Sequence, residues 1–445
     1  MRSPDSVTAR PGEFPRICAA RKHCELGCVG VGFGPSRDVS AGVAGRVSFE
    51  ASGPGKSGER DAGFPVGLPT GRVTCRPGAS VVGVQSRLGS KLVLNHRVRT
   101  AAVATAAALC AALPVTTAQA DPADPVISAH RLAADPVAAD GSRITDVTYD
   151  SDRHLTMKVY SAAMDKDVTV LVQRPADTSV PRPVLYLLNG NGGGVDLVSW
   201  ETNTDVLQFL NDKNVNVVTA IGGASSYYTD WQKPDPVLGV NKWKTFFTEE
   251  LPPLIDAALA TDGTNAIAAI SMTETSILQL AEAKPGLYRA LGAYSGCAGT
   301  SDHYGRDFVK TVVEFYGGGD VRNMWGEDDD PMWQANDPLL HAEGLRGMKL
   351  YFSTGTGMPG VHDNIQDDHI AGPVGHDPVM LADQIVIGGL IEAGVNWCTH
   401  NLQTTLGQLN IPATFDFQPN GTHSWGYWED EFKKSWPVLA DGLGI

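Results

Sequence analysis

The chain has 445 residues, a length that by itself suggests two or three domains. Hydrophobic residues make up 42% of it and charged residues 19%, a globular balance that excludes wholesale disorder. The formal net charge of −15 excludes nucleic acid as the main partner, because phosphate binding needs a basic surface.

Charge divides the chain into two unlike parts near residue 120. Residues 1–120 contain 15 Lys and Arg against 7 Asp and Glu, a balance of +8. Residues 121–445 contain 20 against 43, a balance of −23. Such asymmetry indicates that the two parts have different roles and must be interpreted separately.

Residues 91–120 have the features of a secretory signal peptide. A positive start at Lys91, Arg97 and Arg99 precedes an apolar run over 101–113, and an Ala-Gln-Ala cleavage signature ends the segment. The run is shorter than the ~20 residues that a membrane-spanning helix needs. We predict a secreted protein without an integral membrane segment in its mature form; a buried Ala-rich helix is the alternative.

The segments on either side of this signal lack a folding pattern. Residues 1–90 are rich in Gly, Pro, Arg and Ser without a sustained period, which predicts that they do not pack. Because a signal peptide is read from the start of a chain, we expect translation to begin near residues 90–93. Residues 121–150 are polar and predict a loosely ordered lead-in, and residues 151–445 predict one folded domain.

Within that domain, short apolar runs typical of buried strands alternate with helical patterns. The runs cover residues 184–188, 215–221, 266–270, 291–294, 348–352 and 413–417. The helical patterns cover about 200–212, 243–260, 272–283, 302–315, 378–395 and 427–441. Strands that are apolar on both faces and alternate with helices predict an α/β fold, with a mostly parallel sheet covered on both sides.

The chemistry of such sheets gathers at the carboxyl ends of the strands. Residues 189–194 (Asn-Gly-Asn-Gly-Gly-Gly) follow the first apolar run. They lack the spacing of a nucleotide-binding loop, so this interpretation is weak. Small residues there also suit an oxyanion hole, in which backbone N–H groups face a reacting carbonyl. A plain flexible turn is the simpler alternative for this segment taken alone.

Ser271 follows another apolar run and opens a helical pattern. A serine at a sharp strand-to-helix turn is the nucleophile elbow of α/β hydrolases, usually written G-x-S-x-G. Here Ala269 and Thr273 take the glycine positions, and the threonine is a departure. A serine in this place is more often a simple helix cap.

His423 lies just after the last apolar run, where the general base of this fold belongs. Glu392 is an isolated carboxylate in an apolar helical stretch, so it faces either solvent or a partner such as His423. Five aspartates compete with it on spacing alone: Asp363, Asp367, Asp368, Asp377 and Asp383.

Five of the seven cysteines precede residue 121, and only Cys297 and Cys398 follow it. We predict that these two form a disulfide that holds the helix of Glu392 to the sheet; two buried thiols are the alternative. The spacing of Cys18, Cys24 and Cys28 lacks a matching His/Cys pair, so we expect no metal, and no motif predicts a cofactor.

Several ordered stretches carry a resemblance to a known family. They include 221–231, 242–252, 323–326, 330–333, 336–338 and the Asn-Gly-Thr-His-Ser-Trp motif at 420–425. Residues 155–442 resemble the secreted mycolyltransferases of the antigen 85 type and their relatives. These proteins belong to the α/β-hydrolase superfamily, so the resemblance implies an α/β-hydrolase catalytic domain.

The resemblance implies a catalytic triad and an oxyanion hole. The nucleophile of the family falls on Ser271, its histidine on His423 and its glutamate on Glu392, where the local sequence diverges most. Its oxyanion donors fall on the backbone N–H groups of Met272 and Asn191. His423 would take the proton of Ser271, an acyl-enzyme would form, and a sugar hydroxyl would then accept the acyl group.

This chain departs from the family near the implied acceptor site. Asn189 and Gly192 replace an aspartate and an arginine that face trehalose in the antigen 85 proteins. Asn189 and Trp425 nevertheless remain the expected substrate contacts. Glu274 replaces a small residue behind the nucleophile and would either perturb the site or face solvent.

The resemblance implies a cell-wall-associated acyltransferase that moves mycolyl groups from trehalose-type glycolipids to a cell-wall polysaccharide acceptor. A carboxylesterase with the same triad, releasing the acyl group to water, is one alternative. The other is a non-catalytic wall-binding protein that kept the fold.

Overall fold

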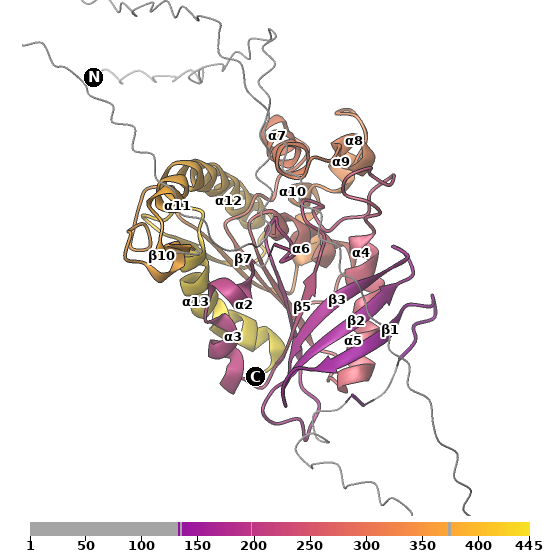
Figure 1. Ribbon diagram of the computed structural model, residues 1–445. Helices are drawn as coiled ribbons and strands as arrows, with labels where there is room; N and C mark the ends of the chain where they lie inside the picture. The colour runs from indigo at the N-terminus through magenta and orange to yellow at the C-terminus, as the bar shows by residue number, and fades with distance from the viewer. Residues whose placement is uncertain (1–131, 134–135, 197, 373–374) are drawn as a thin grey trace, which may run out of the picture. The chain divides into compact units, whose positions relative to one another are not determined.

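The computed structural model describes residues 132–133, 136–196, 198–372 and 375–445. The predicted leader at 1–90 and the predicted signal segment at 91–120 lie outside the described residues. The described part is built on one large sheet with helices on both faces (Figure 1).

The large sheet has nine strands in the order β1-β2-β3-β5-β4-β6-β7-β8-β11. The six strands from β5 to β11 run parallel, whereas β1, β2, β3 and β5 pair antiparallel in succession. The strands are β1 Arg143–Tyr149, β2 His154–Ser161, β3 Lys166–Gln173, β4 Val184–Leu188, β5 Asn216–Ile221, β6 Asn265–Ile270, β7 Ala290–Tyr294, β8 Lys349–Thr354 and β11 Thr414–Phe417. All six predicted strands are present, so the predicted α/β class is confirmed.

The antiparallel strands β1, β2 and β3 were not predicted. Residues of β2 alternate between buried and more exposed positions, because this edge of the sheet covers the core with one face only. β1 differs from the expectation of a loosely ordered lead-in over residues 143–149. It pairs with β2 over most of its length, and its Ile144 and Val147 pack against the core.

Most helices follow the predicted segments with longer or broken ends, whereas the short helices between residues 321 and 341 were not predicted. They are α2 Trp200–Asn203, α3 Val206–Phe209, α4 Trp243–Thr245, α5 Leu251–Leu259, α6 Met272–Ala283, α7 His303–Lys310, α8 Val321–Met324, α9 Met332–Ala335, α10 Pro338–His341, α11 Pro378–Asp383, α12 Gly389–Leu409 and α13 Trp425–Leu443. Wider π-helical turns η2 (Phe246–Glu250) and η6 (Gln384–Gly388) connect α4 to α5 and α11 to α12. A small second sheet pairs β9 (Ala371–Gly372) with β10 (Gly375–His376).

The core lies on both faces of the sheet, because all five residues of β4 are buried. Tyr186 and Leu188 belong to the apolar cluster beneath α5 and α6. Leu185 and Leu187 belong to a second cluster beneath α13, which packs across β6, β7 and β8. This arrangement holds the carboxyl ends of β6, β8 and β11 at one edge of the sheet.

One helical stretch, Pro378–Leu409, bears on the prediction that the mature form has no integral membrane segment. By length and composition it could cross a membrane, and 22% of its most apolar window is buried. A core helix of a soluble protein can meet the same criterion. In this fold the stretch packs against β8 and carries the buried residues Glu392 and Cys398.

Candidate active site

Ser271 occupies a strained turn between β6 and α6. Its φ is +56° and its ψ is −133°, a backbone conformation that non-glycine residues avoid unless the surroundings enforce it. The Ser271 N–H donates to Tyr294 O at 2.9 Å, which ties the turn to β7. The hydroxyl makes no capping hydrogen bond to α6, so the interpretation of Ser271 as a simple helix cap does not hold.

The structure brings Ser271, His423 and Glu392 together from three distant parts of the chain. His423 Nε2 lies 2.8 Å from Ser271 Oγ, and His423 Nδ1 lies 2.9 Å from Glu392 Oε2. His423 sits on the loop between β11 and α13, where its N–H donates to Gly388 O at 3.2 Å. The edge of its ring meets Trp428 with the ring centres 4.9 Å apart. These contacts hold the imidazole between a hydroxyl and a carboxylate.

Glu392 is 1% exposed, and its second oxygen has three further hydrogen bonds. Glu392 Oε1 accepts from Ser295 Oγ at 2.8 Å, from Thr354 Oγ1 at 2.9 Å and from Gly355 N at 2.7 Å. Hydrogen bonds to the charged form offset much of the cost of burying a carboxylate. Their donors follow β7 and end β8, so no local pattern around Glu392 could reveal them.

The five competing aspartates have other partners or face solvent. Asp363 accepts from Thr422 Oγ1 at 2.6 Å and from the hydroxyl of Tyr427. Asp377 caps α11, and Asp367 contacts two histidines that are described below. Asp368 and Asp383 are exposed. Among the carboxylates named as candidates, Glu392 is the one in contact with His423.

The Gly-rich loop at 189–194 lies against the elbow. A Cβ added to Gly190 would be 3.6 Å from Ser271 Cβ and 3.3 Å from the Ile270 side chain, so glycine permits this close approach. The carbonyl of Asn191 accepts from Ser225 N at 2.9 Å, and its side-chain oxygen accepts from Ser225 Oγ at 2.8 Å. These bonds fix the orientation of the loop beside Ser271.

Asn189 differs from the expectation of a substrate contact, because it is 0% exposed. Its Oδ1 accepts from the backbone N–H of Trp200 at 3.1 Å, and its carbonyl accepts from Thr273 Oγ1 at 2.6 Å. The side chain therefore secures the loop to α2. Thr273, the departure from the usual elbow, links the loop to α6.

Trp425, an expected substrate contact, and Gly192, a departure from the family, each pack against neighbouring side chains. Trp425 is partly buried at the start of α13, and its ring is 5.6 Å from that of Trp200 and 5.2 Å from that of Trp428. A Cβ at Gly192 would collide with the carboxylate of Asp196. A larger residue at position 192 would thus displace Asp196.

Glu274 does not face solvent: it is 1% exposed on the first turn of α6. Its Oε2 accepts from Gly296 N at 2.7 Å, while Oε1 has no hydrogen-bond partner among the described residues. Burial raises the pKa of Glu274 to about 8, and the charge of Glu392 adds to the effect of burial. A second, protonated carboxyl therefore lies behind the nucleophile at neutral pH.

Replacing Glu274 with glutamine is expected to remove a pH-dependent loss of stability. Below pH 4.5, the usual pKa of the group, the carboxyl is protonated whether the chain is folded or unfolded. Between there and about pH 8 the unfolded chain releases this proton and the folded chain keeps it. Stability then falls by up to about 1.4 kcal/mol per pH unit, and Glu274→Gln should abolish this contribution.

Urea unfolding of wild type and Glu274→Gln at intervals between pH 5 and 8 measures this contribution. The gain in stability of the variant over wild type should grow as the pH rises. Substitution of the exposed Glu314 by glutamine is the matched control and should give no such growth. Parallel pH profiles for wild type and Glu274→Gln would contradict the prediction.

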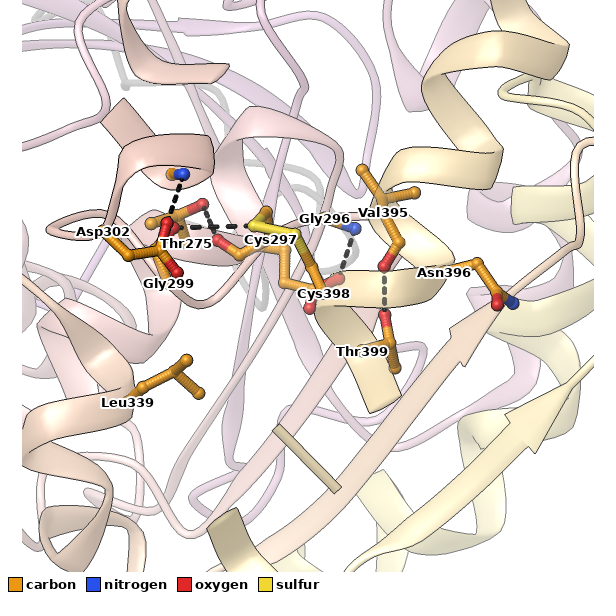
Figure 2. Close-up of a disulfide and its surroundings, with 12 residues drawn as sticks. Thr275, Gly296, Cys297, Gly299, Asp302, Leu339, Val395, Asn396, Cys398 and Thr399 are labelled. Carbon is orange, nitrogen blue, oxygen red and sulfur yellow. Dashed lines mark hydrogen bonds between the residues drawn. A yellow bond between two sulfur atoms is a disulfide. The ribbon is translucent and has the colours of Figure 1, made fainter. Parts of the chain in front are cut away.

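A disulfide joins Cys297 to Cys398, with their Cα atoms 5.0 Å apart (Figure 2). Cys297 follows β7. It comes directly after Ser295, whose hydroxyl donates to Glu392, and Gly296, whose N–H donates to Glu274. Cys398 lies on α12. The carbonyl of Cys297 also accepts from Thr275 Oγ1 on α6 at 2.7 Å. The loop after β7 is thereby connected to both carboxyl-bearing helices.

Comparison with known proteins agrees with this geometry. Residues 161–438 match the family described as "Putative esterase". The chain is 31% identical over 296 residues to diacylglycerol acyltransferase/mycolyltransferase Ag85A of Mycobacterium tuberculosis, covering 65% of this chain and 81% of that protein. It is 30% identical over 294 residues to Ag85B of Mycobacterium avium, covering 65% and 83% of the two chains.

A solved structure supports the fold. The crystal structure of Mycobacterium tuberculosis MPT51 (FbpC1) superimposes with a TM-score of 0.53 at 23% identity, covering 65% of this chain and 98% of that one. The sheet, the elbow and this likeness define an α/β-hydrolase-fold protein of the esterase class. Within this class, the chain belongs to the family of the antigen 85 mycolyltransferases.

Proposed function

We propose that the protein is a secreted serine acyltransferase that moves mycolyl or similar long-chain acyl groups from trehalose-type glycolipids to cell-wall sugar acceptors. The observation that carries the proposal is the 2.8 Å contact between Ser271 Oγ and His423 Nε2 at a strained elbow. The names of the Ag85 relatives supply the acyl-transfer class. The disulfide supports export, because such bonds persist in oxidising compartments.

In the proposed mechanism Ser271 is the nucleophile and His423 the general base. Glu392 holds Nδ1 of the imidazole and stabilises the imidazolium that forms when His423 takes the serine proton. Ser271 Oγ attacks the ester carbonyl, His423 returns the proton to the leaving sugar, and an acyl-enzyme remains. A second sugar hydroxyl, activated by the same histidine, then receives the acyl group.

The backbone N–H groups of Met272 and Asn191 are the proposed oxyanion donors. Met272 is the first residue of α6, next to the nucleophile, and Asn191 lies in the loop that touches Ser271 through Gly190. Each such donor typically contributes ~2.7–4 kcal/mol to the transition state. The hydrogen bonds from Ser225 to Asn191 would hold the second donor in place.

A long-chain acyl substrate is supported by an apolar surface beside the site. Val386, Ile387 and Leu390 are exposed by 64%, 41% and 73% on the helical stretch that leads into Glu392. Gly388, within this segment, accepts the hydrogen bond from His423 N. Exposed apolar side chains on a segment that contacts the loop of His423 suit a lipid chain.

Hydrolysis of acyl esters is the second candidate, and the loop at 189–194 favours it. Gly192 carries no side chain, and Asn189 is buried, so neither supplies a charged contact to an acceptor sugar. Without a firmly held sugar hydroxyl, water can take the acyl group from Ser271. Whether a sugar hydroxyl or water takes the acyl group from Ser271 therefore decides between acyl transfer and hydrolysis.

Incubation with an acyl-trehalose donor, with and without free trehalose, tests the proposal. An acyltransferase should convert added trehalose into new acyl ester, and an esterase should release free acid at a rate that trehalose does not change. Labelling by a fluorophosphonate reports the reactivity of Ser271 independently of the acceptor. A wild-type protein that resists labelling would contradict a catalytic role altogether.

A further inference from the structure

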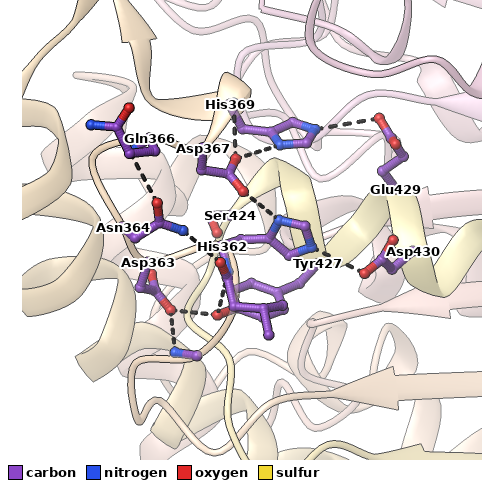
Figure 3. Close-up of polar contacts among 12 residues, drawn as sticks. His362, Asp363, Asn364, Gln366, Asp367, His369, Ser424, Tyr427, Glu429 and Asp430 are labelled. Carbon is purple, nitrogen blue, oxygen red and sulfur yellow. Dashed lines mark hydrogen bonds and ion pairs between the residues drawn. The ribbon is translucent and has the colours of Figure 1, made fainter.

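Two histidines outside the proposed triad converge on one aspartate. His362 Nδ1 lies 2.7 Å from Asp367 Oδ2, and His369 Nδ1 lies 2.7 Å from Asp367 Oδ1 (Figure 3). One ligand atom from each of the three residues lies within 4.8 Å of the others. The exposed fraction is 16% for each imidazole and 11% for Asp367, so the group is largely withdrawn from solvent.

The outer nitrogen of each imidazole faces a carboxylate on α13. His362 Nε2 lies 3.0 Å from Asp430 Oδ2, and His369 Nε2 lies 3.3 Å from Glu429 Oε2 (Figure 3). Metal-binding histidines in proteins commonly donate their second N–H to a carboxylate, which fixes the tautomer and the ring orientation. Both histidines here have this arrangement, with Nδ1 turned inward.

This arrangement favours positive charge between the imidazoles and Asp367, because carboxylate oxygens face both nitrogens of each ring. When each Nε2–H donates outward, each Nδ1 presents a lone pair to an oxygen that also presents lone pairs. Protons on both rings can fill these positions, because each imidazole lies between Asp367 and a carboxylate of α13. One divalent ion in place of the two inner protons also satisfies both Nδ1 atoms and the carboxylate of Asp367.

We propose that His362, Asp367 and His369 form a binding site for one divalent transition-metal ion, with Zn²⁺ the best match. Imidazole nitrogen and carboxylate oxygen are preferred zinc ligands at about 2.0–2.2 Å. Tetrahedral zinc separates such ligands by about 3.3 Å, so a movement of about half an ångström would admit the ion. Any proton on either Nδ1 leaves as the ion binds.

The site joins a loop to the helix that follows His423. His362 and His369 belong to the segment after β8, whereas Asp430 and Glu429 belong to α13. The ring of His362 packs on this helix beside Gly426, where a Cβ would lie 2.6 Å from His362 Nδ1. A bound ion would therefore brace the loop after β8 against α13.

Titration of the EDTA-treated wild-type protein with Zn²⁺, followed by calorimetry, tests the site. We expect one ion per chain and a higher Tm on binding, because an ion that binds only the folded chain stabilises it. Substitution of Co²⁺ should produce the visible absorption of a tetrahedral site with nitrogen and oxygen ligands. A wild-type protein that takes up neither ion would overturn the proposal and leave a network of imidazolium ions and carboxylates.

The affinity of single-residue variants for Zn²⁺ tests whether the ion binds at His362, Asp367 and His369. His369→Ala and Asp367→Asn should each weaken Zn²⁺ binding at least 100-fold, and Asp430→Asn should weaken it about 10–100-fold through the outer contact. His423→Ala and the exposed-histidine variant His400→Ala should bind as wild type does. Loss of binding in His423→Ala, with retention in His369→Ala, would place the ion at the triad and overturn the proposal.

Circular dichroism and fluorophosphonate labelling of Ser271 show whether the variants of His369 and Asp367 still fold. A folded His369→Ala protein that binds Zn²⁺ with unchanged affinity also contradicts the site. Asp430→Asn keeps all three ligands and provides a milder variant whose affinity can be measured even if His369→Ala does not fold.

Discussion

Replacing Ser271 with alanine is expected to lower kcat for acyl transfer or hydrolysis by about 10⁶-fold, without loss of the fold. Ser271 Oγ is the proposed nucleophile, and its removal leaves only the oxyanion donors and substrate binding. The hydroxyl makes no capping bond to α6, so its loss should not destabilise that helix. Steady-state kinetics with an acyl ester, together with fluorophosphonate labelling, measure the effect.

A matched control lies on the same helix. Ser276 is also buried on α6, and its hydroxyl donates to Met272 O at 3.4 Å, so Ser276→Ala removes a hydroxyl without touching His423. It should keep most of the activity. In the double variant of Ser271→Ala with Glu392→Gln, the two losses should not add, because the residues are proposed to act as a unit. Activity in Ser271→Ala near that of wild type would reject the proposed nucleophile.

Breaking the disulfide between Cys297 and Cys398 is expected to lower the free energy of unfolding by about 2–5 kcal/mol. The bond closes a loop of 101 residues, for which chain entropy alone predicts about 4.7 kcal/mol. It also connects α12, which carries Glu392, to the loop whose Ser295 donates to that carboxylate. Urea unfolding of wild type and of a protein with serine at both positions measures the loss.

Reductant separates this effect from any other consequence of the substitutions. Dithiothreitol should shift the unfolding midpoint of wild type toward that of the double-serine protein and leave the latter unchanged. Activity should decline as well if α12 loosens. Equal unfolding free energies for the oxidised wild type and the double-serine protein would contradict the prediction.

Local patterns predicted the elements that contain long apolar runs. β4 is buried at all five positions, so its sequence is continuously apolar and unambiguous. β1, β2 and β3 lack a continuous apolar run, because a strand with one face in the core alternates apolar and polar residues, and so they were not predicted. The sequence predicted one helix over residues 378–395. In the structure, the π-helical turn η6 joins α11 to α12, and the helical stretch continues to Leu409.

Site residues that directly follow a strand could be proposed from the sequence, whereas residues chosen by contacts between distant parts of the chain could not. Ser271 and His423 follow strands, so the order of the elements made them candidates, and the family resemblance then selected them. The choice of Glu392 over five aspartates depends on donors from Ser295, Thr354 and Gly355, which the chain brings together only on folding.

The sequence by itself determined the charge balance of the two parts of the chain and the order of the elements with apolar runs. It also determined that Ser271 and His423 each follow a strand. Short-range patterns suffice for these, because burial of a strand or helix leaves its period in the chain. Only the tertiary structure decided that Asn189 is buried and that Glu274 is an internal acid. It also decided that His362 and His369 share Asp367 beneath α13. These environments arise from residues far apart in the chain, whose proximity no local spacing encodes.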